Sequence, residues 1–258
     1  MSTTTRMPAL FLAHGSPMNA IEDNEFTRAL SALPANLPEP KAILMVSAHW
    51  LTDTPRVSTL DAPRTIHDFG GFPDELYEIQ YPAPGAPELA ARVAELLPGV
   101  LLDESWGLDH GAWTVLRHMW PDANIPVTQL SVAAGGDPQF HLELGRALAP
   151  LRDEGVLIIG SGNIVHSFAG IDWSPHPRAH LWALEFDVWV AEALVRGDDE
   201  ALVEYHRAGP AAQLSVPSND HYLPLLYATG ARLDGDAVTF PHTGIDMASM
   251  SMRCVQFG

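Results

Sequence analysis

Three short apolar runs constrain the fold of this chain more than any other feature of its sequence. They cover residues 8–13, 42–48 and 156–159, and in none of them do apolar and polar residues alternate. Runs of this length are too short for typical helices, and continuous apolar character is typical of strands buried on both faces of a parallel sheet. Segments with helix signals follow them, at residues 22–33, 87–97, 138–151 and 177–196.

The alternation of strand and helix segments predicts a single α/β domain over residues 1–258, with a central, largely parallel or mixed sheet flanked by helices. In the last of the long helices, an apolar stripe predicts the side that packs on the core. Residues 61–87 contain many prolines and glycines and several aromatic residues, which predicts a long functional loop. The stripe consists of Leu181, Leu184, Val188 and Ala191.

The charge of the chain excludes some classes of partner. There are 32 acidic and 14 basic residues, for a net charge of −18. This excess argues against a protein that binds nucleic-acid phosphates or anionic lipid. With Cys254 as the one cysteine, neither an internal disulfide nor a zinc site of several thiolates can form. The polar segment 1–6 and the absence of long apolar stretches predict a cytoplasmic protein without a targeting signal or membrane span.

The positions of the histidines predict a site. His14 and His49 directly follow the first two apolar runs, and His166 lies a few residues after the third. Ligands of open α/β sheets bind at the carboxyl ends of the strands, so we expect these imidazoles to converge there. Imidazole suits zinc and iron, and three protein ligands leave a catalytic metal open positions. A histidine taken alone is more often a structural or surface residue, so the prediction depends on all three together.

Two further histidines lie at predicted helix starts. His221 is expected in the first turn of a helix, and His110 follows Asp109, a candidate N-cap. Helix capping alone accounts for either segment, so neither histidine is assigned to the site on this pattern. The signatures of zincins, serine hydrolases with a nucleophile elbow and P-loop nucleotidases are absent. The Gly-x-Gly at residues 160–162 is too short to predict a dinucleotide site.

Taken together, these segments resemble a known family. The sequence is similar to the class III extradiol ring-cleaving dioxygenases, and most similar to their DOPA 4,5-dioxygenase-like branch. The resemblance implies a mononuclear non-haem Fe(II) enzyme that opens a catechol ring with O2 to give a muconic semialdehyde. Zn(II) can occupy such a site in a purified sample. The resemblance extends from residue 8 to the C-terminus, with the motifs in the family's order, at residues 9–18, 46–50, 65–73, 107–113, 160–166 and 219–224.

The resemblance also implies roles for the histidines. His14 and His49 match the family's two N-terminal metal ligands, and His221 matches the third ligand of the DOPA branch. The wider family has a glutamate in this third role, so the departure leaves an all-imidazole set that also suits zinc. His166 matches the acid/base beside the metal and can serve as a fourth ligand. His110 matches a histidine that faces the substrate.

A loop of the family that lines the substrate pocket is matched by His67, Asp68 and Phe69. The implied partners are a small aromatic diol and O2. The net charge of −18 repels anions at long range, so an aromatic carboxylate would need neutralisation by the metal and by arginines. The sequence predicts neither the particular catechol nor the oligomeric state.

Two other functions are compatible with the same residues. One is a zinc-binding enzyme with a non-oxidative reaction, and the other is a binding protein that carries a vestigial site on the related scaffold. His166 bears on the second, because a binding scaffold needs no acid/base beside three ligands. We therefore expect a metal-dependent dioxygenase.

Overall fold

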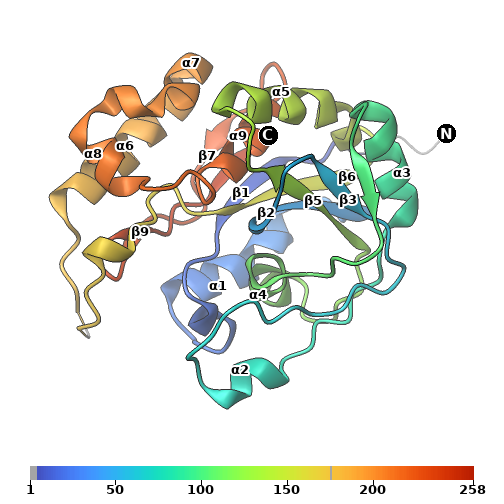
Figure 1. Ribbon diagram of the computed structural model, residues 1–258, viewed down its shortest axis with the longest axis horizontal. Helices are drawn as coiled ribbons and strands as arrows, with labels where there is room; N and C mark the ends of the chain where they lie inside the picture. Colours follow the sequence, from blue (N-terminus) through green and yellow to red (C-terminus); the bar gives the residue numbers. More distant parts are fainter. Residues whose placement is uncertain (1–4, 175) are drawn as a thin grey trace.

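A mixed sheet crosses the centre of the molecule (Figure 1). The computed structural model describes residues 5–174 and 176–258, and the first four residues of the polar N-terminal segment lie outside them. The strands are β1 (Ala9–Ala13), β2 (Ala42–Thr52), β3 (Arg56–Ser58), β4 (Leu101–Asp103), β5 (Val127–Ala133), β6 (Val156–Gly162), β7 (Val238–Thr239), β8 (Ile245–Asp246), β9 (Met250–Ser251) and β10 (Val255–Phe257).

The strand order of the main sheet is β4-β3-β5-β2-β6-β1-β10-β7. Its four central strands, β5, β2, β6 and β1, are parallel, and β10 and β3 pair antiparallel at either side. The remaining pair, β8 and β9, forms a small hairpin. The prediction of one α/β domain with a mixed sheet is therefore confirmed.

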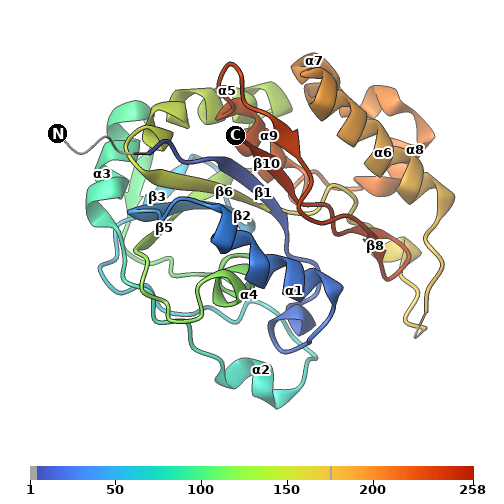
Figure 2. The same ribbon diagram turned by 180° about the vertical axis from the view of Figure 1, so that it is seen from behind.

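Helices cover both faces of the sheet. Figures 1 and 2 show α1 and α4 on one face and α5 and α9 on the other, while α6, α7 and α8 extend beyond the sheet. The helices are α1 (Glu25–Ala32), α2 (Asp74–Glu78), α3 (Pro87–Leu96), α4 (His110–Met119), α5 (Pro138–Leu148), α6 (Leu181–Arg196), α7 (Asp199–Val203), α8 (Pro210–Ser215) and α9 (Leu223–Gly230), with 3₁₀ helices η1 (Pro17–Ala20), η2 (Leu33–Asn36), η3 (Ala149–Arg152), η4 (Phe168–Gly170) and η5 (Tyr205–Ala208).

Burial on both faces explains why apolar and polar residues do not alternate in the central strands. In β1, Ala9 and Phe11 pack into the core beneath α5 and α9, whereas Leu10 and Leu12 pack into the core beneath α1 and α4. Neighbouring side chains of a strand point to opposite faces, so a strand with two buried faces must be apolar at every position. The side chains of β1 are fully buried on both sides.

The structure corrects the predicted boundaries of two helices. The segment 22–33 forms α1 only from Glu25, because the Asn24 side chain accepts a hydrogen bond from the Thr27 amide and caps the helix. The segment 177–196 becomes helical at Leu181, after His180 at the N-cap. Of these two helices, only α1 has a side-chain cap at its start, because His180 forms no capping hydrogen bond.

The predicted core stripe of α6 was wrong at three of its four positions. Leu181, Leu184 and Val188 are exposed, and only Ala191 of the stripe is buried. The opposite side faces inward and packs in the core, and Asp187 on this side forms a buried ion pair with Arg253. This helix is apolar on both sides, so its period alone could not indicate which side packs. The core-facing apolar residues are Ala183, Phe186, Val190, Ala193 and Leu194.

Residues 61–87 form the expected long connection, although it contains the short helix α2. Its ends are held by isolated bridges from Thr65 to Leu108 and from Gly85 to Val127. These bridges anchor both ends of the loop, while α2 in its middle lies away from the sheet (Figure 1). None of the helices in residues 5–174 and 176–258 is long and apolar enough to cross a membrane.

Burial of His141 predicts a pH dependence of stability. This α5 residue is fully buried, its Nδ1 lies 3.0 Å from the Tyr227 hydroxyl, and burial lowers its pKa from 6.5 to about 4. The unfolded chain therefore binds more protons than the folded protein between these values, and stability falls as pH decreases from 6.5 to about 4. The expected contribution is about 3 kcal/mol.

We expect this contribution to disappear in a His141→Gln variant, which keeps a polar group near Tyr227. The measurement is the free energy of urea unfolding of both proteins across this pH range. The decline toward low pH should be shallower in the variant. Parallel pH profiles for the two proteins would show that His141 does not have this role.

Candidate metal centre

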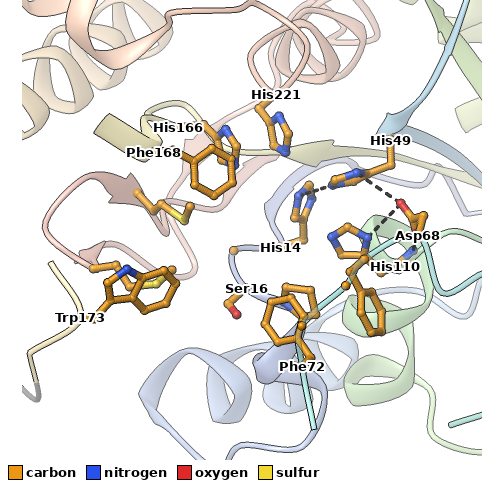
Figure 3. A pocket seen from close by; sticks show the side chains of 17 residues that line it. His14, Ser16, His49, Asp68, Phe72, His110, His166, Phe168, Trp173 and His221 are labelled. Atoms are coloured by element: carbon orange, nitrogen blue, oxygen red, sulfur yellow. Dashed lines mark hydrogen bonds and ion pairs between the residues drawn. The ribbon is translucent and has the colours of Figure 1, made fainter. Parts of the chain in front are cut away.

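The site is built where the parallel strands end. His14 directly follows β1, and Ala13 of that strand pairs with Gly162 at the end of β6. His166 follows β6 after a short turn, as expected. The convergence predicted from the strand ends thus holds, and Figure 3 shows these histidines around one cavity with His221.

His49 reaches the site in a way that differs from the prediction. It does not follow β2 but lies within it, and the pairing of β2 with β5 shifts register between Val46 and Leu51. An irregularity of this kind re-aims side chains and is common next to active sites. The local backbone therefore turns the His49 side chain toward His14, although the strand continues to Thr52.

His221 also differs from its predicted place. It lies in the turn before α9, which begins at Leu223, rather than in the first turn of the helix. The end of β6 holds this turn, since the Asn163 amide donates a hydrogen bond of 2.9 Å to the His221 carbonyl. A Cβ on Gly162 would lie 2.1 Å from that carbonyl oxygen. The Gly-x-Gly therefore permits close packing of the backbone beside His221.

Three imidazoles form a cluster of metal-ligand geometry. His14, His49 and His221 each offer a nitrogen, and these nitrogens lie within 4.8 Å of one another. The Nε2 atoms of His14 and His49 are 3.1 Å apart. Such spacing suits three donors around one ion. The sequence had placed His14 and His49 here by itself, and His221 by resemblance.

A hydrogen-bond chain sets the tautomer of His14. Its Nδ1 lies 2.9 Å from the Ser161 hydroxyl, and that hydroxyl donates its one hydrogen to the Gly111 carbonyl at 2.6 Å. Ser161 must therefore accept the hydrogen on Nδ1 of His14, which leaves a lone pair on Nε2. The nitrogen that faces His49 is thus the one able to bind a metal.

Carboxylates orient the other two imidazoles in the same way. Asp68 Oδ2 lies 3.3 Å from Nδ1 of His49, and Asp220 Oδ2 lies 2.5 Å from Nδ1 of His221. Burial, the largest single effect, raises the pKa of Asp220, but the hydrogen bond and charge of His221 and the hydrogen bond with Ser218 together hold the pKa below its usual value. Carboxylates that hold the outer nitrogen of a histidine are characteristic of metal sites.

Two imidazoles of the cluster, His14 and His49, are kept neutral. Burial, and then the proximity of the other imidazoles, lowers the pKa of His14 and of His49 well below the usual value. Both rings are therefore unprotonated at neutral pH, as metal ligation requires. An all-imidazole set of neutral donors suits iron and zinc.

His166 lies beside the cluster rather than in it. Its ring stacks on His221 with centroids 3.5 Å apart and an angle of 3° between planes. Among the described residues, two groups have ligand spacing, and neither includes His166: they are His14, His49 and His221, and His49, Asp68 and His110. Burial and the neighbouring His221 lower the pKa of His166 to about 3.

His110 faces the cavity from the first position of α4. The Asp109 side chain caps this helix by accepting a hydrogen bond from the Ala112 amide, as the sequence predicted. The His110 amide donates to Asp68 at 2.9 Å, and its Nδ1 lies 3.0 Å from the other Asp68 oxygen. Asp68 therefore positions both His49 and His110 (Figure 3).

The predicted pocket loop lines the cavity in part. Asp68 and Phe69 lie on the cavity wall, but His67 does not. Nε2 of His67 lies 2.9 Å from the Ile79 carbonyl, and its ring packs edge-on against Phe69 and Trp113. Because adjacent side chains of an extended loop point to different sides, His67 supports Phe69 from behind.

The cavity has a volume of about 580 Å³ and an opposite wall that the sequence did not predict. Phe168, Trp173, Met247 and Met250 form this wall. Sequence reasoning also missed the orienting residues of the cluster. Asp220, directly before His221 in the sequence, was a usable signal for an orienting carboxylate. The residues of the apolar wall come from loops without a periodic pattern, so no such signal existed for them.

The fold and the site together define the class, an α/β protein with a candidate catalytic metal centre. Residues 3–257 match the family model for the catalytic LigB subunit of aromatic ring-opening dioxygenase. The chain belongs to this family, which confirms the resemblance to class III extradiol dioxygenases.

Relatives of the chain carry one shared description. It is 48% identical to a protein of Escherichia coli (strain K12) described as 4,5-DOPA dioxygenase extradiol, over 99% of this chain and 96% of that protein. A Beta vulgaris protein of the same description is 43% identical, over 96% of this chain and 95% of the relative. The crystal structure of an uncharacterized protein from Escherichia coli K12 superposes with a TM-score of 0.87 and 44% identity, covering 98% of this chain and 100% of that one.

Proposed function

We propose that this chain is a metal-dependent extradiol dioxygenase that inserts O2 into a catechol ring and produces a muconic semialdehyde. One catalytic domain over residues 1–258 carries the reaction. The observation that supports the proposal most strongly is the cluster of His14, His49 and His221, whose outer nitrogens are all held by Ser161 or carboxylates. Family membership supports the same reaction class.

Fe(II) is the expected metal, and Zn(II) fits the same donors. The three neutral imidazoles would hold the ion and leave its remaining positions to substrate and oxygen. A bound ferrous ion supplies acidification of the diol and activation of O2. His166, stacked on His221, is placed to interact with the substrate instead of completing the ligand set.

The protein residues bind the diol and move its protons. His166 accepts a proton from one hydroxyl at its imidazole and returns it to the opening ring, and a neutral ring is ready for the first step. His110 has Nδ1 at Asp68, which leaves Nε2 for a hydrogen bond to the substrate. Phe69 packs on His110 with centroids 5.6 Å apart and forms an apolar wall for the ring.

The reaction balances because both atoms of O2 are found in the product. The bond between a hydroxyl-bearing ring carbon and its unsubstituted neighbour breaks. One new carbonyl forms as the aldehyde and the other as the acid. The electrons come from the ring itself, so no external reductant is required.

Anaerobic reconstitution with Fe(II) tests this function. The protein is loaded without oxygen, mixed with a panel of catechols and then exposed to O2. We expect a yellow semialdehyde and consumption of one O2 per catechol. Absence of product with every catechol would contradict the proposal, and a hydrolytic activity of the zinc-loaded protein would favour a non-oxidative enzyme instead.

Removal of the Asp68 charge is expected to weaken the metal site. In Asp68→Asn, the amide no longer fixes the Nδ1 hydrogen of His49, and metal affinity should fall by about 10- to 100-fold. Competition with a chelator measures the affinity. Asp122→Asn, at an exposed position outside the cavity, is the matched control. Equal affinity in both variants would show that Asp68 does not support the metal.

A further inference from the structure

The cavity has a second region beyond the histidines. The diol must lie at the cluster of His14, His49 and His221, but a volume of about 580 Å³ leaves room for more than one ring. Figure 3 shows Trp173 across the cavity from Asp68 and His110. A substituent on the diol ring would therefore extend toward this wall.

The far wall is apolar and open. Phe168 and Trp173 are 69% and 74% exposed, although both line the cavity. Large aromatic side chains gain free energy when a ligand covers them. Met247 and Met250 complete this wall, and methionine side chains adapt to apolar groups of varied shape.

No lysine or arginine of the described residues lines the cavity. All 14 lysine and arginine residues of the chain belong to the described residues, and none lines it. Ten of the arginines form ion pairs with carboxylates elsewhere. Arg178, near Trp173 in sequence, is exposed outside the wall. The arginines expected to neutralise a carboxylate are therefore not present at the site.

The backbone holds Met247 in a costly conformation. Met247 and Ala248 have φ of 46° and 64°, and they are the two central residues of the turn 246–249 that joins β8 to β9. The Ser249 amide donates to the Asp246 carbonyl at 3.2 Å, which closes the turn. Asn and Gly are the residues that such a hairpin turn favours. A methionine here places a long apolar side chain at the cavity despite this preference.

We propose that the wall of Phe168, Trp173, Met247 and Met250 is a subsite for the ring substituent, and that it selects catechols with an uncharged apolar substituent over those with a carboxylate. The proposal rests on the proposed function, because it assumes that the diol lies at the histidine cluster. A carboxylate placed against this open apolar wall finds no lysine or arginine counter-ion and loses part of its hydration, and the net charge of −18 adds to this penalty.

A matched set of catechols tests the subsite. The compounds are 4-propylcatechol, 3-(3,4-dihydroxyphenyl)propionate, dopamine and L-DOPA, which share the diol and differ in side-chain charge. Their dissociation constants are measured by calorimetry on Fe(II)-loaded protein without oxygen, so binding is read separately from turnover. We expect 4-propylcatechol to bind at least about tenfold more tightly than the propionate. From 4-methyl- to 4-propylcatechol, affinity should increase about fourfold per methylene.

Variants of the wall residues provide a second test of the subsite. Trp173→Ala should reduce the gain per methylene while leaving the affinity for unsubstituted catechol unchanged. Met247→Asn, which suits the turn, should do the same without loss of folding. Leu181→Ala removes an exposed apolar side chain outside the cavity and should change neither. Trp173→Arg should shift the preference toward the propionate.

Two results would overturn the subsite. One is tighter binding of the propionate or L-DOPA, which both carry a carboxylate, than of 4-propylcatechol. The other is an unchanged gain per methylene in both Trp173→Ala and Met247→Asn. Failure of the dioxygenase function is seen separately, as absence of product with every catechol, and the anaerobic binding series still decides the selectivity in that case.

Discussion

Replacement of His14 by alanine is expected to abolish stoichiometric binding of a divalent metal and, with it, ring cleavage. The Nε2 atom of His14 lies 3.1 Å from that of His49, and its tautomer is set by Ser161. Two imidazoles cannot retain a catalytic ion as three do. We expect less than about a tenth of a metal ion per chain and a loss of activity of at least about a thousandfold.

The same result is expected for His221→Ala, because His221 belongs to the same three-nitrogen group. Metal content by elemental analysis, after dialysis against a weak chelator, measures the effect. His206→Ala is the matched control, since that histidine is exposed and lies outside the cluster. Full metal occupancy in either His14→Ala or His221→Ala would show that the ion binds elsewhere.

The central sheet could be predicted because two buried faces leave a simple trace in the sequence. Strand β1 and residues 156–159 of β6 are apolar at every position, and that pattern is visible without a structure. The place of His14 follows from it, because a polar residue directly after such a strand lies at the carboxyl edge of the sheet. The position of His14 is thus a consequence of the apolar pattern of the strand before it.

Other parts depend on contacts between segments that are distant in sequence. His49 is aimed by an irregularity inside β2, and His221 by the packing of its turn on Gly162. Neither effect follows from local propensity. The inward side of α6 was misjudged for the same reason, since the ion pair of Asp187 with Arg253 joins segments 66 residues apart.

The residues that line the cavity bear on how the net charge of the chain affects an anionic substrate. The sequence led to an expectation of arginines near the site for an anionic substrate, but none of the arginines of the described chain lines the cavity. The apolar wall near Trp173 is instead the part of the cavity that a ring substituent would meet. Selectivity therefore depends on loop residues, while the reaction depends on the strand ends.

Replacement of His166 by alanine should separate proton transfer from metal binding. His166 stacks on His221 but does not belong to the three-nitrogen group, so the variant should retain nearly full metal occupancy. Loss of a positioned acid/base should lower kcat by about 100- to 10,000-fold. Elemental analysis and oxygen uptake with 4-propylcatechol measure the two quantities on the same sample. Loss of the metal would make His166 a fourth ligand, and unchanged turnover would exclude it from proton transfer. Leu181→Ala, which removes an exposed apolar side chain outside the cavity, is the control and should change neither quantity.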